Sequence, residues 1–213
     1  MLTVNEIFHS IQGESSYAGR PCVFVRLTAC DLRCVWCDSP YAFHEGRKVS
    51  IDEVVAEVER FGCPLVEMTG GEPLLQKDLY PLMERLHASG HQVLIETGGH
   101  RSIELVPAWA TVIMDVKCPG SGEAGKHDPA NFGRLRPHDE VKFVIADRAD
   151  YDYARDVLAR EQLAGRVAAV HFSPVHDRLT PKALAEWVLE DRLPVRVQLQ
   201  VHKYIWGADV RGV

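Results

Sequence analysis

The sequence lacks a hydrophobic run long enough to cross a membrane. Its apolar stretches extend over only a few residues, whereas a membrane-spanning helix needs about 20. The first ten residues, MLTVNEIFHS, contain neither the basic segment nor the apolar segment of a secretory signal. We therefore expect a cytoplasmic protein that does not associate with membranes.

An excess of positive charge is also missing. The chain has 24 Lys and Arg residues against 30 Asp and Glu residues, which gives a net charge of −6. Because it has no polybasic run either, a nucleic-acid partner is not expected. Linkers, repeats and low-complexity tracts are absent, and 46% of the 213 residues are hydrophobic. This composition predicts one folded domain that spans residues 1–213.

Strand and helix patterns alternate along the chain. Strands are predicted at residues 21–27, 65–68, 92–96, 111–116, 140–146, 167–172 and 195–201. Four helices are predicted: the first begins at Ser50, the second ends at about Ser89, the third spans residues 151–163 and the fourth begins at Thr180. Residues 118–137 are predicted to form a long polar loop. Such alternation predicts an α/β fold of parallel βα units. Because helices are fewer than strands, we expect an incomplete, abbreviated TIM-like barrel with its site at the carboxyl ends of the strands.

The six cysteines are unevenly distributed. Cys30, Cys34 and Cys37 lie within eight residues (CDLRCVWC), whereas Cys22, Cys63 and Cys118 are isolated and read as buried small hydrophobic residues. A reducing cytosol argues against disulfides. Structural zinc sites usually combine two separate cysteine or histidine pairs, although a zinc site completed by one of the ten histidines stays open as an alternative. Three thiolates on a [4Fe-4S] cluster would leave one iron free for S-adenosylmethionine (SAM).

A second motif, Thr69-Gly70-Gly71-Glu72-Pro73, follows a predicted strand one βα unit later. Glycines there let the backbone approach a ligand closely, and exposed carbonyl oxygens can accept hydrogen bonds from an ammonium group. Together with Cys-x3-Cys-x2-Cys, this motif resembles the radical SAM superfamily.

A narrower resemblance is carried by four segments: EIFHSIQGE (6–14), Arg26-Leu27, CVWCDS (34–39) and LQVHKYIW (199–206). They are similar to the 7-carboxy-7-deazaguanine synthase family. The resemblance implies a homodimer with an abbreviated radical SAM barrel. It also implies the conversion of 6-carboxy-5,6,7,8-tetrahydropterin to 7-carboxy-7-deazaguanine with loss of ammonia, in 7-deazapurine (queuosine) biosynthesis. An electron donor such as flavodoxin or ferredoxin is implied as a partner.

The resemblance also implies roles for individual residues. Cys30, Cys34 and Cys37 would hold the [4Fe-4S] cluster. The SAM site would comprise Trp36, Cys37, Asp38, Gly71, Asp115, Val116, Lys117, Ser173, Pro174, Val175 and His176. The pterin would contact Ile11, Gln12, Gly13, Glu14, Arg26, Thr69 and Val213. Mg²⁺ would bind the hydroxyl of Ser39, where the family usually has threonine; a serine hydroxyl is an equally hard oxygen ligand.

Two other functions remain open from the sequence. An activating enzyme for a glycyl-radical protein has a similar length and the same cysteine spacing, but it lacks the IQGE segment joined to Arg26. A non-catalytic iron–sulfur or zinc module is the third possibility. Among single residues, Arg26 could be a surface charge, Lys117 a solvated strand end, and His176 an ordinary surface histidine.

Overall fold

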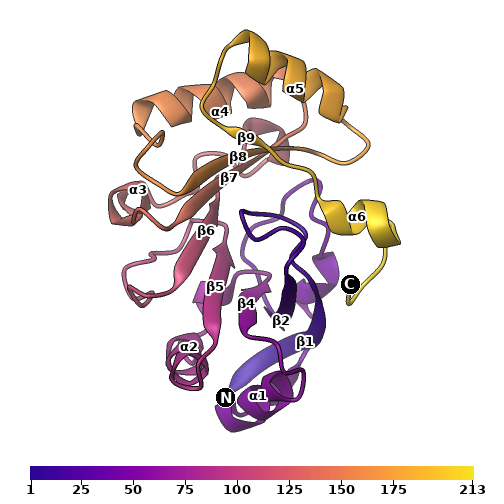
Figure 1. Ribbon diagram of the computed structural model, residues 1–213, viewed down its shortest axis with the longest axis vertical. Coiled ribbons are helices and arrows are strands. Elements are labelled where there is room, and N and C mark those ends of the chain that lie inside the picture. The colour runs from indigo at the N-terminus through magenta and orange to yellow at the C-terminus, as the bar shows by residue number, and fades with distance from the viewer.

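The structure is a computed structural model that describes residues 1–213. Its nine strands form one sheet in the order β3-β1-β2-β4-β5-β6-β7-β8-β9. The strands are β1 (Leu2–Ile11), β2 (Pro21–Leu27), β3 (Arg47–Val49), β4 (Leu65–Gly70), β5 (Gln92–Thr97), β6 (Thr111–Asp115), β7 (Glu140–Ile145), β8 (Ala169–Pro174) and β9 (Arg196–Val197). The sheet curves but β9 does not pair with β3, so the barrel stays open (Figure 1). The predicted partial barrel is confirmed.

The seven predicted strands form the parallel part of this sheet, from β2 through β4 to β9. β1 and β3 were not predicted, and both pair antiparallel. β1 is half-buried along most of its length and therefore carries polar residues among apolar ones, which weakens its alternation.

The chain has six helices. They are α1 (Ile51–Glu59), α2 (Leu79–Ala88), α3 (Ala130–Arg134), α4 (Arg148–Arg160), α5 (Pro181–Glu190) and α6 (Val201–Trp206). Of these, α6 lies at the cavity of the barrel and contributes His202 and Lys203 to its wall. Ser50 and Glu53 form the predicted capping box at the start of α1. The Thr180 side chain accepts a hydrogen bond from the backbone N–H of Ala183 and so caps α5. α4 begins three residues before its predicted start, because Asp147 caps it.

Two predicted elements differ in part from the structure. The predicted loop 118–137 contains a 3₁₀ turn (Pro119–Ser121) and the short helix α3. The predicted strand 195–201 pairs with β8 only over Arg196–Val197, and α6 begins at Val201. The side chain of Gln198 bonds to the backbone of Ser15, and that of Gln200 bonds to Glu14, so this segment leaves the sheet edge despite its alternating pattern.

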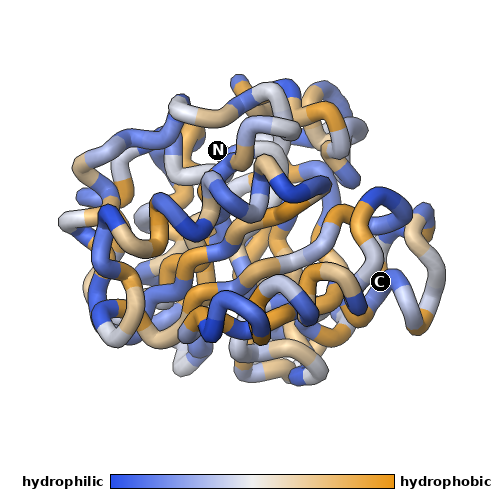
Figure 2. Tube along the Cα trace, turned by 90° about the horizontal axis from the view of Figure 1, so that it is seen from above, coloured by the Kyte–Doolittle hydropathy of each residue, from blue (hydrophilic) through white to orange (hydrophobic).

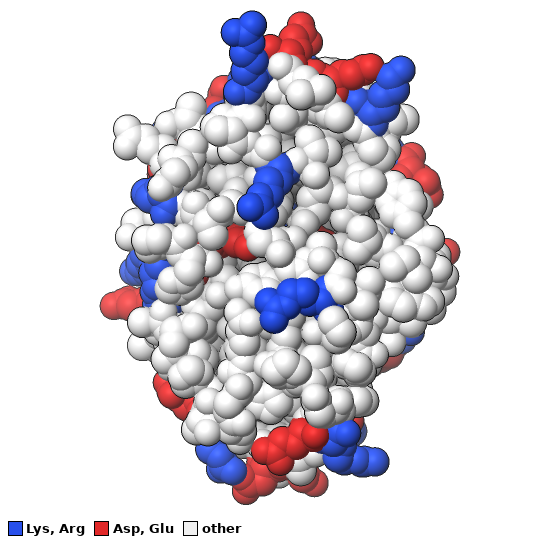
Figure 3. All heavy atoms as spheres, in the orientation of Figure 1, with Lys and Arg blue, Asp and Glu red and all other residues white.

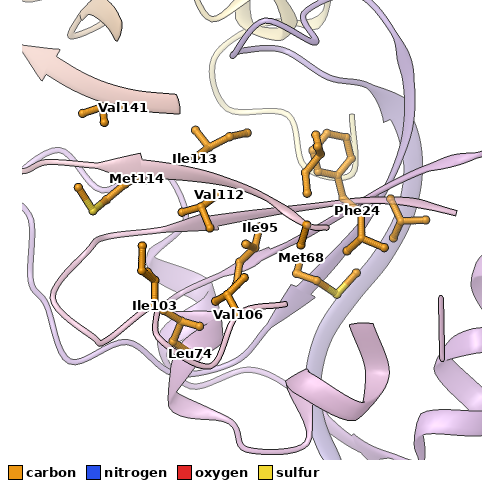
Figure 4. Packing of buried hydrophobic residues seen from close by; sticks show 14 of the residues in the cluster. Phe24, Met68, Leu74, Ile95, Ile103, Val106, Val112, Ile113, Met114 and Val141 are labelled. Atoms are coloured by element: carbon orange, nitrogen blue, oxygen red, sulfur yellow. The ribbon is translucent and has the colours of Figure 1, made fainter. Parts of the chain in front are cut away.

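The hydrophobic core lies between the sheet and the outer helices. Figure 4 shows side chains of consecutive strands in this core, among them Met68, Ile95, Val112 and Val141. Figure 2 shows the hydrophilic stretches on outer helices and loops. The isolated cysteines Cys22, Cys63 and Cys118 are buried among apolar residues. Burial of this apolar surface is the main favourable contribution to folding.

On the face drawn in Figure 3, acidic and basic side chains are interspersed, and many lie at the top and bottom edges. None of the helices is both long enough and apolar enough to cross a membrane.

The loop between β1 and β2, residues 12–20, lies across the amino-terminal ends of the barrel strands (Figure 1). The Tyr17 hydroxyl contacts Thr111 and Gln92, the first residues of β6 and β5. The backbone N–H of Ser16 donates to the carboxylate of Glu140, the first residue of β7, at 3.0 Å. We call this segment the plug loop, because it closes one end of the barrel.

Candidate active site

The open barrel encloses a cavity of about 300 Å³. It is lined by most of the residues for which the sequence predicts a role. These are Ile11, Gln12, Gly13, Glu14, Arg26, Cys30, Cys34, Trp36, Cys37, Asp38, Ser39, Thr69, Gly71, Asp115, Lys117, Val175, His176 and Val213. Three of the predicted SAM residues are not brought there: Val116, Ser173 and Pro174 are buried and do not line the cavity.

The cysteine loop lies at one side of this cavity. All six thiols are free, and those of Cys30, Cys34 and Cys37 are half-buried at the cavity wall. Two hydrogen bonds to the segment after β6 hold the loop in place. Val35 N–H donates to the Ser121 carbonyl at 3.0 Å, and Arg33 N–H donates to the Glu123 carboxylate at 2.7 Å. The residues from Cys118 to Glu123 thus support the loop.

The thiols fit a cluster better than a single metal ion. Nowhere do three His, Cys, Asp or Glu side chains converge as the ligands of one ion would. In a [4Fe-4S] cluster three thiolates bind three different irons, so they need not converge on one point. Burial raises the pKa of Cys30 to about 11 and also raises that of Cys34. Both therefore carry protons that iron would displace.

The Gly-Gly-Glu-Pro segment lies directly against the cysteine loop. The Gly71 N–H donates to the Leu27 carbonyl at 3.1 Å. A Cβ at Gly71 would lie 2.2 Å from the Ala29 carbonyl oxygen and 2.8 Å from the Cβ of Cys30. Only glycine permits this approach.

Glu72 is fully buried and anchors the same segment. Its carboxylate accepts hydrogen bonds from the Thr97 hydroxyl, the Gly98 N–H and the Leu74 N–H. Burial outweighs these favourable contacts and raises the pKa of Glu72. Glu96, Thr97 and Gly98 line the cavity as well, although they are not among the predicted site residues.

Several charged residues inside the barrel were missed by the sequence analysis. Glu67 of β4, Glu96 of β5 and Lys142 of β7 line the cavity together with Asp115 at the end of β6. Charged residues within otherwise apolar strands, as in LVEMTG, QVLIET and EVKFVI, are the signal that could have identified them.

Lys142 lies at the centre of these acids. Its ammonium nitrogen donates to Glu14 Oε2 at 2.7 Å and forms a short contact with Glu96, and it lies 3.6 Å from Asp115 Oδ2. Asp115 Oδ2 also accepts a hydrogen bond from Lys117 at 2.9 Å. The other oxygen, Asp115 Oδ1, is buried and has no hydrogen-bond partner.

These contacts determine the protonation of the acids. Burial opposes ionisation of Glu14, but the Lys142 charge and hydrogen bonds from Lys142 and Gln200 lower the pKa of Glu14 to about 2. The carboxylates raise the pKa of Lys142 well above its ordinary value against the effect of burial. Burial raises the pKa of Glu67 and Glu96, and the other acids of the cavity add to this rise. Lys142 is thus a buried cation among more acids than it can neutralise.

Arg26 projects into the cavity from β2. Its side chain is 17% exposed, and its Nε donates to Glu6 at 2.7 Å, so the interpretation as a surface charge is wrong. Lys117 is paired with Asp115 and is likewise not a solvated strand end. His176 lines the cavity with its side chain 31% exposed.

Ser39 and Asp38 lie where the cysteine loop meets the C-terminal segment. Ser39 precedes a 3₁₀ turn, and its hydroxyl makes no capping hydrogen bond, so it is free to bind a ligand. Asp38 lies 3.5 Å from Lys203 and accepts from Gln200 at 3.4 Å. Val201 N–H donates to the Gly13 carbonyl, which joins this segment to the plug loop.

Comparison with known proteins agrees with this geometry. Residues 25–116 match the model of the radical SAM superfamily. The chain is 53% identical to the 7-carboxy-7-deazaguanine synthase of Koribacter versatilis over the full length of both chains. It is 46% identical to that of Chlorobaculum tepidum, covering 100% of this chain and 97% of the relative. The fold is similar to that of QueE from Escherichia coli, with a TM-score of 0.77 and 21% identity over 93% of this chain and 92% of that one.

These relatives favour the synthase over a glycyl-radical activating enzyme or a non-catalytic metal module. Superfamily membership also implies a [4Fe-4S] cluster and SAM as cofactors. The chain belongs to the 7-carboxy-7-deazaguanine synthase family of radical SAM enzymes.

Proposed function

We propose that this enzyme converts 6-carboxy-5,6,7,8-tetrahydropterin to 7-carboxy-7-deazaguanine and ammonia. The observation that carries the proposal is one cavity lined by both the cysteine loop and the plug loop. SAM, held at the cysteine loop, and the pterin, held at the plug loop, can therefore lie close to each other inside one barrel.

The thiols of Cys30, Cys34 and Cys37 would hold the cluster, and SAM would lie against Trp36–Asp38, Gly71 and Asp115–Lys117. When bound at these residues, the cluster and SAM would together supply the radical that removes a hydrogen atom from the substrate. Asp115 Oδ1, buried and unpartnered, is placed to accept a hydrogen bond from a ligand hydroxyl. Because Gly71 packs directly against Ala29 and Cys30, SAM bound at Gly71 would lie next to the cysteine loop.

The pterin would be held by the plug loop and β2. Gln12 and Glu14 offer an amide and an ionised carboxylate, which complement the N–H groups of an aminopyrimidine. The Nε of Arg26 is occupied by Glu6, which leaves its terminal nitrogens for the substrate carboxylate. The pterin ring would lie between Arg26 on one side and Gln12 and Glu14 on the other, and Val213 lines the same cavity.

Mg²⁺ is part of the proposal. The free hydroxyl of Ser39 would bind it, while substrate and water would supply most other ligands, as is common for this ion. The ion would fix the substrate carboxylate and polarise it.

The remaining partners are supported by the surface. Exposed apolar side chains in α6 and the residues after it, namely Tyr204, Ile205, Trp206 and Val210, support a homodimer. The exposed Arg33 within the cysteine loop supports an acidic electron donor such as flavodoxin or ferredoxin. The free thiols support a cytoplasmic location, and one sheet with one core supports a single domain.

An anaerobic assay tests the function. The reconstituted protein is incubated with carboxytetrahydropterin, SAM and dithionite, and 5′-deoxyadenosine and the deazapurine product are measured by mass spectrometry. We expect both products, and neither in Cys34→Ala, whereas Cys63→Ala retains iron and activity. 5′-Deoxyadenosine without deazapurine would reject the substrate, and full iron content in Cys34→Ala would reject the cluster ligands.

A further inference from the structure

Lys142 contacts both of the proposed ligand subsites. On one side it donates to Glu14 of the plug loop, a proposed pterin residue. On the other side it lies 3.6 Å from Asp115, a proposed SAM residue. Asp115 and Lys142 are register partners on the adjacent parallel strands β6 and β7, so their side chains emerge on the same face.

The hydrogen bonds of Lys142 are incomplete. An ammonium group has three N–H donors, and in this structure two of them have acceptors, in Glu14 and Glu96. The third has no acceptor within hydrogen-bond distance, and Asp115 Oδ2 at 3.6 Å is just beyond it. Because Lys142 is 5% exposed, water competes little for that donor.

A ligand at either subsite changes this arrangement. An N–H group that donates to Glu14 takes part of the acceptor capacity of this carboxylate, and it thereby weakens the hold of Glu14 on Lys142. The ammonium can then move toward Asp115 and complete its third hydrogen bond. That bond fixes the carboxylate of Asp115, a residue that lines the cavity where SAM is proposed to bind and whose buried Oδ1 has no hydrogen-bond partner.

We propose that Lys142 couples the two subsites, so that the pterin raises the affinity for SAM and SAM raises the affinity for the pterin. The inference rests on the proposed function. The two effects are equal, because coupling between binding sites is reciprocal. A coupling of about fivefold or more is the usual size for two linked sites.

The test is equilibrium binding of SAM to the anaerobically reconstituted holoenzyme, with and without carboxytetrahydropterin and without reductant, so that no turnover occurs. The ratio of the two SAM dissociation constants is the coupling factor. We expect about fivefold or more for the natural protein and a factor near one for Lys142→Met.

Two further variants make the result specific. Lys117→Met also removes a half-buried ammonium group from Asp115, but Lys117 makes no contact with Glu14. It should weaken SAM binding and leave the coupling factor unchanged. The double variant Lys142→Met/Glu96→Gln keeps the net charge of the cavity, and it should fold and lack coupling if Lys142→Met alone is unstable.

The outcomes separate the two proposals. If the pterin binds and is converted but the natural protein has a coupling factor of one, the inference is wrong and the proposed function stands. The inference is also wrong if the double variant or Lys142→Met retains the natural factor. If the pterin does not bind to the natural protein, the proposed function fails and this inference fails with it.

Discussion

The backbone N–H of Glu72 donates a 2.8 Å hydrogen bond to the carbonyl oxygen of Ala29, the residue directly before Cys30. This bond joins the Gly-Gly-Glu-Pro segment to the start of the cysteine loop. Ala29 has a φ of +83°, a conformation that is strained for a residue with a side chain. The two motifs therefore form one structural unit, in which the position of Cys30 depends on Gly71 and Glu72.

Substitution of Gly71 by alanine should disrupt this unit. The new Cβ would overlap the Ala29 carbonyl and press on Cys30, so we expect Gly71→Ala to lose most of its reconstituted iron and about 1–3 kcal/mol of stability. Iron content and thermal unfolding measure both effects. Gly133→Ala is the matched control, because nothing lies within 4 Å of a Cβ there. Equal iron content in the two variants would contradict the close approach.

Arg26 should contribute to pterin binding and not to SAM binding. A hydrogen bond between charged groups contributes about 1.5–3 kcal/mol, so Arg26→Ala should raise the KM for the pterin by about 10–100-fold. The dissociation constant of SAM should stay the same. Arg20→Ala in the same hairpin, whose side chain is exposed, should change neither quantity. Loss of SAM binding in Arg26→Ala would assign this residue to the other subsite.

Ser39 should determine the dependence on magnesium. We expect turnover of the natural protein to rise with added Mg²⁺, because the ion holds the substrate carboxylate. Ser39→Ala should lower both the rate and this dependence, whereas Ser39→Thr, which keeps the hydroxyl, should retain both. Rates are measured against Mg²⁺ concentration. Full activity of Ser39→Ala in excess chelator would show that this protein does not use the ion.

Glu67 should make stability depend on pH. Burial, followed by the nearby Glu96 charge, raises the pKa of Glu67 well above its ordinary value, so the folded protein keeps a proton that the unfolded chain loses. The folded state binds more protons, and the contribution of Glu67 to stability therefore falls as pH rises above the ordinary carboxyl pKa.

The variant Glu67→Gln removes this titration and keeps an acceptor for the hydrogen bond from Gln12. Its thermal midpoint at pH 8 should exceed that of the natural protein by about 2–4 °C per kcal/mol recovered, and the difference should shrink toward pH 4. Glu190→Gln on the surface is the control. A lower midpoint for Glu67→Gln at pH 8 would mean that the ionised carboxylate stabilises the fold.

The parallel strands and the cysteine loop could be predicted from the sequence, because both depend on local patterns: apolar runs for buried strands and close spacing for ligands. Lys142 and Glu96 could not be given a role in this way. They lie 46 residues apart in the chain and meet only after the sheet has curved. The segment after Arg196 also misled the prediction, because its alternation is typical of a strand while its glutamines bond to the plug loop.

The contacts between the plug loop and the C-terminal segment have a consequence for the order of folding. Ser15 and Gln198 are 183 residues apart, and Glu14 and Gln200 are 186 residues apart. Contacts of such separation require closure of nearly the whole chain, which makes them late events. During synthesis the plug loop leaves the ribosome early and must wait for its partners until almost all of the chain has followed. Completion of the cavity is thus among the last steps of folding.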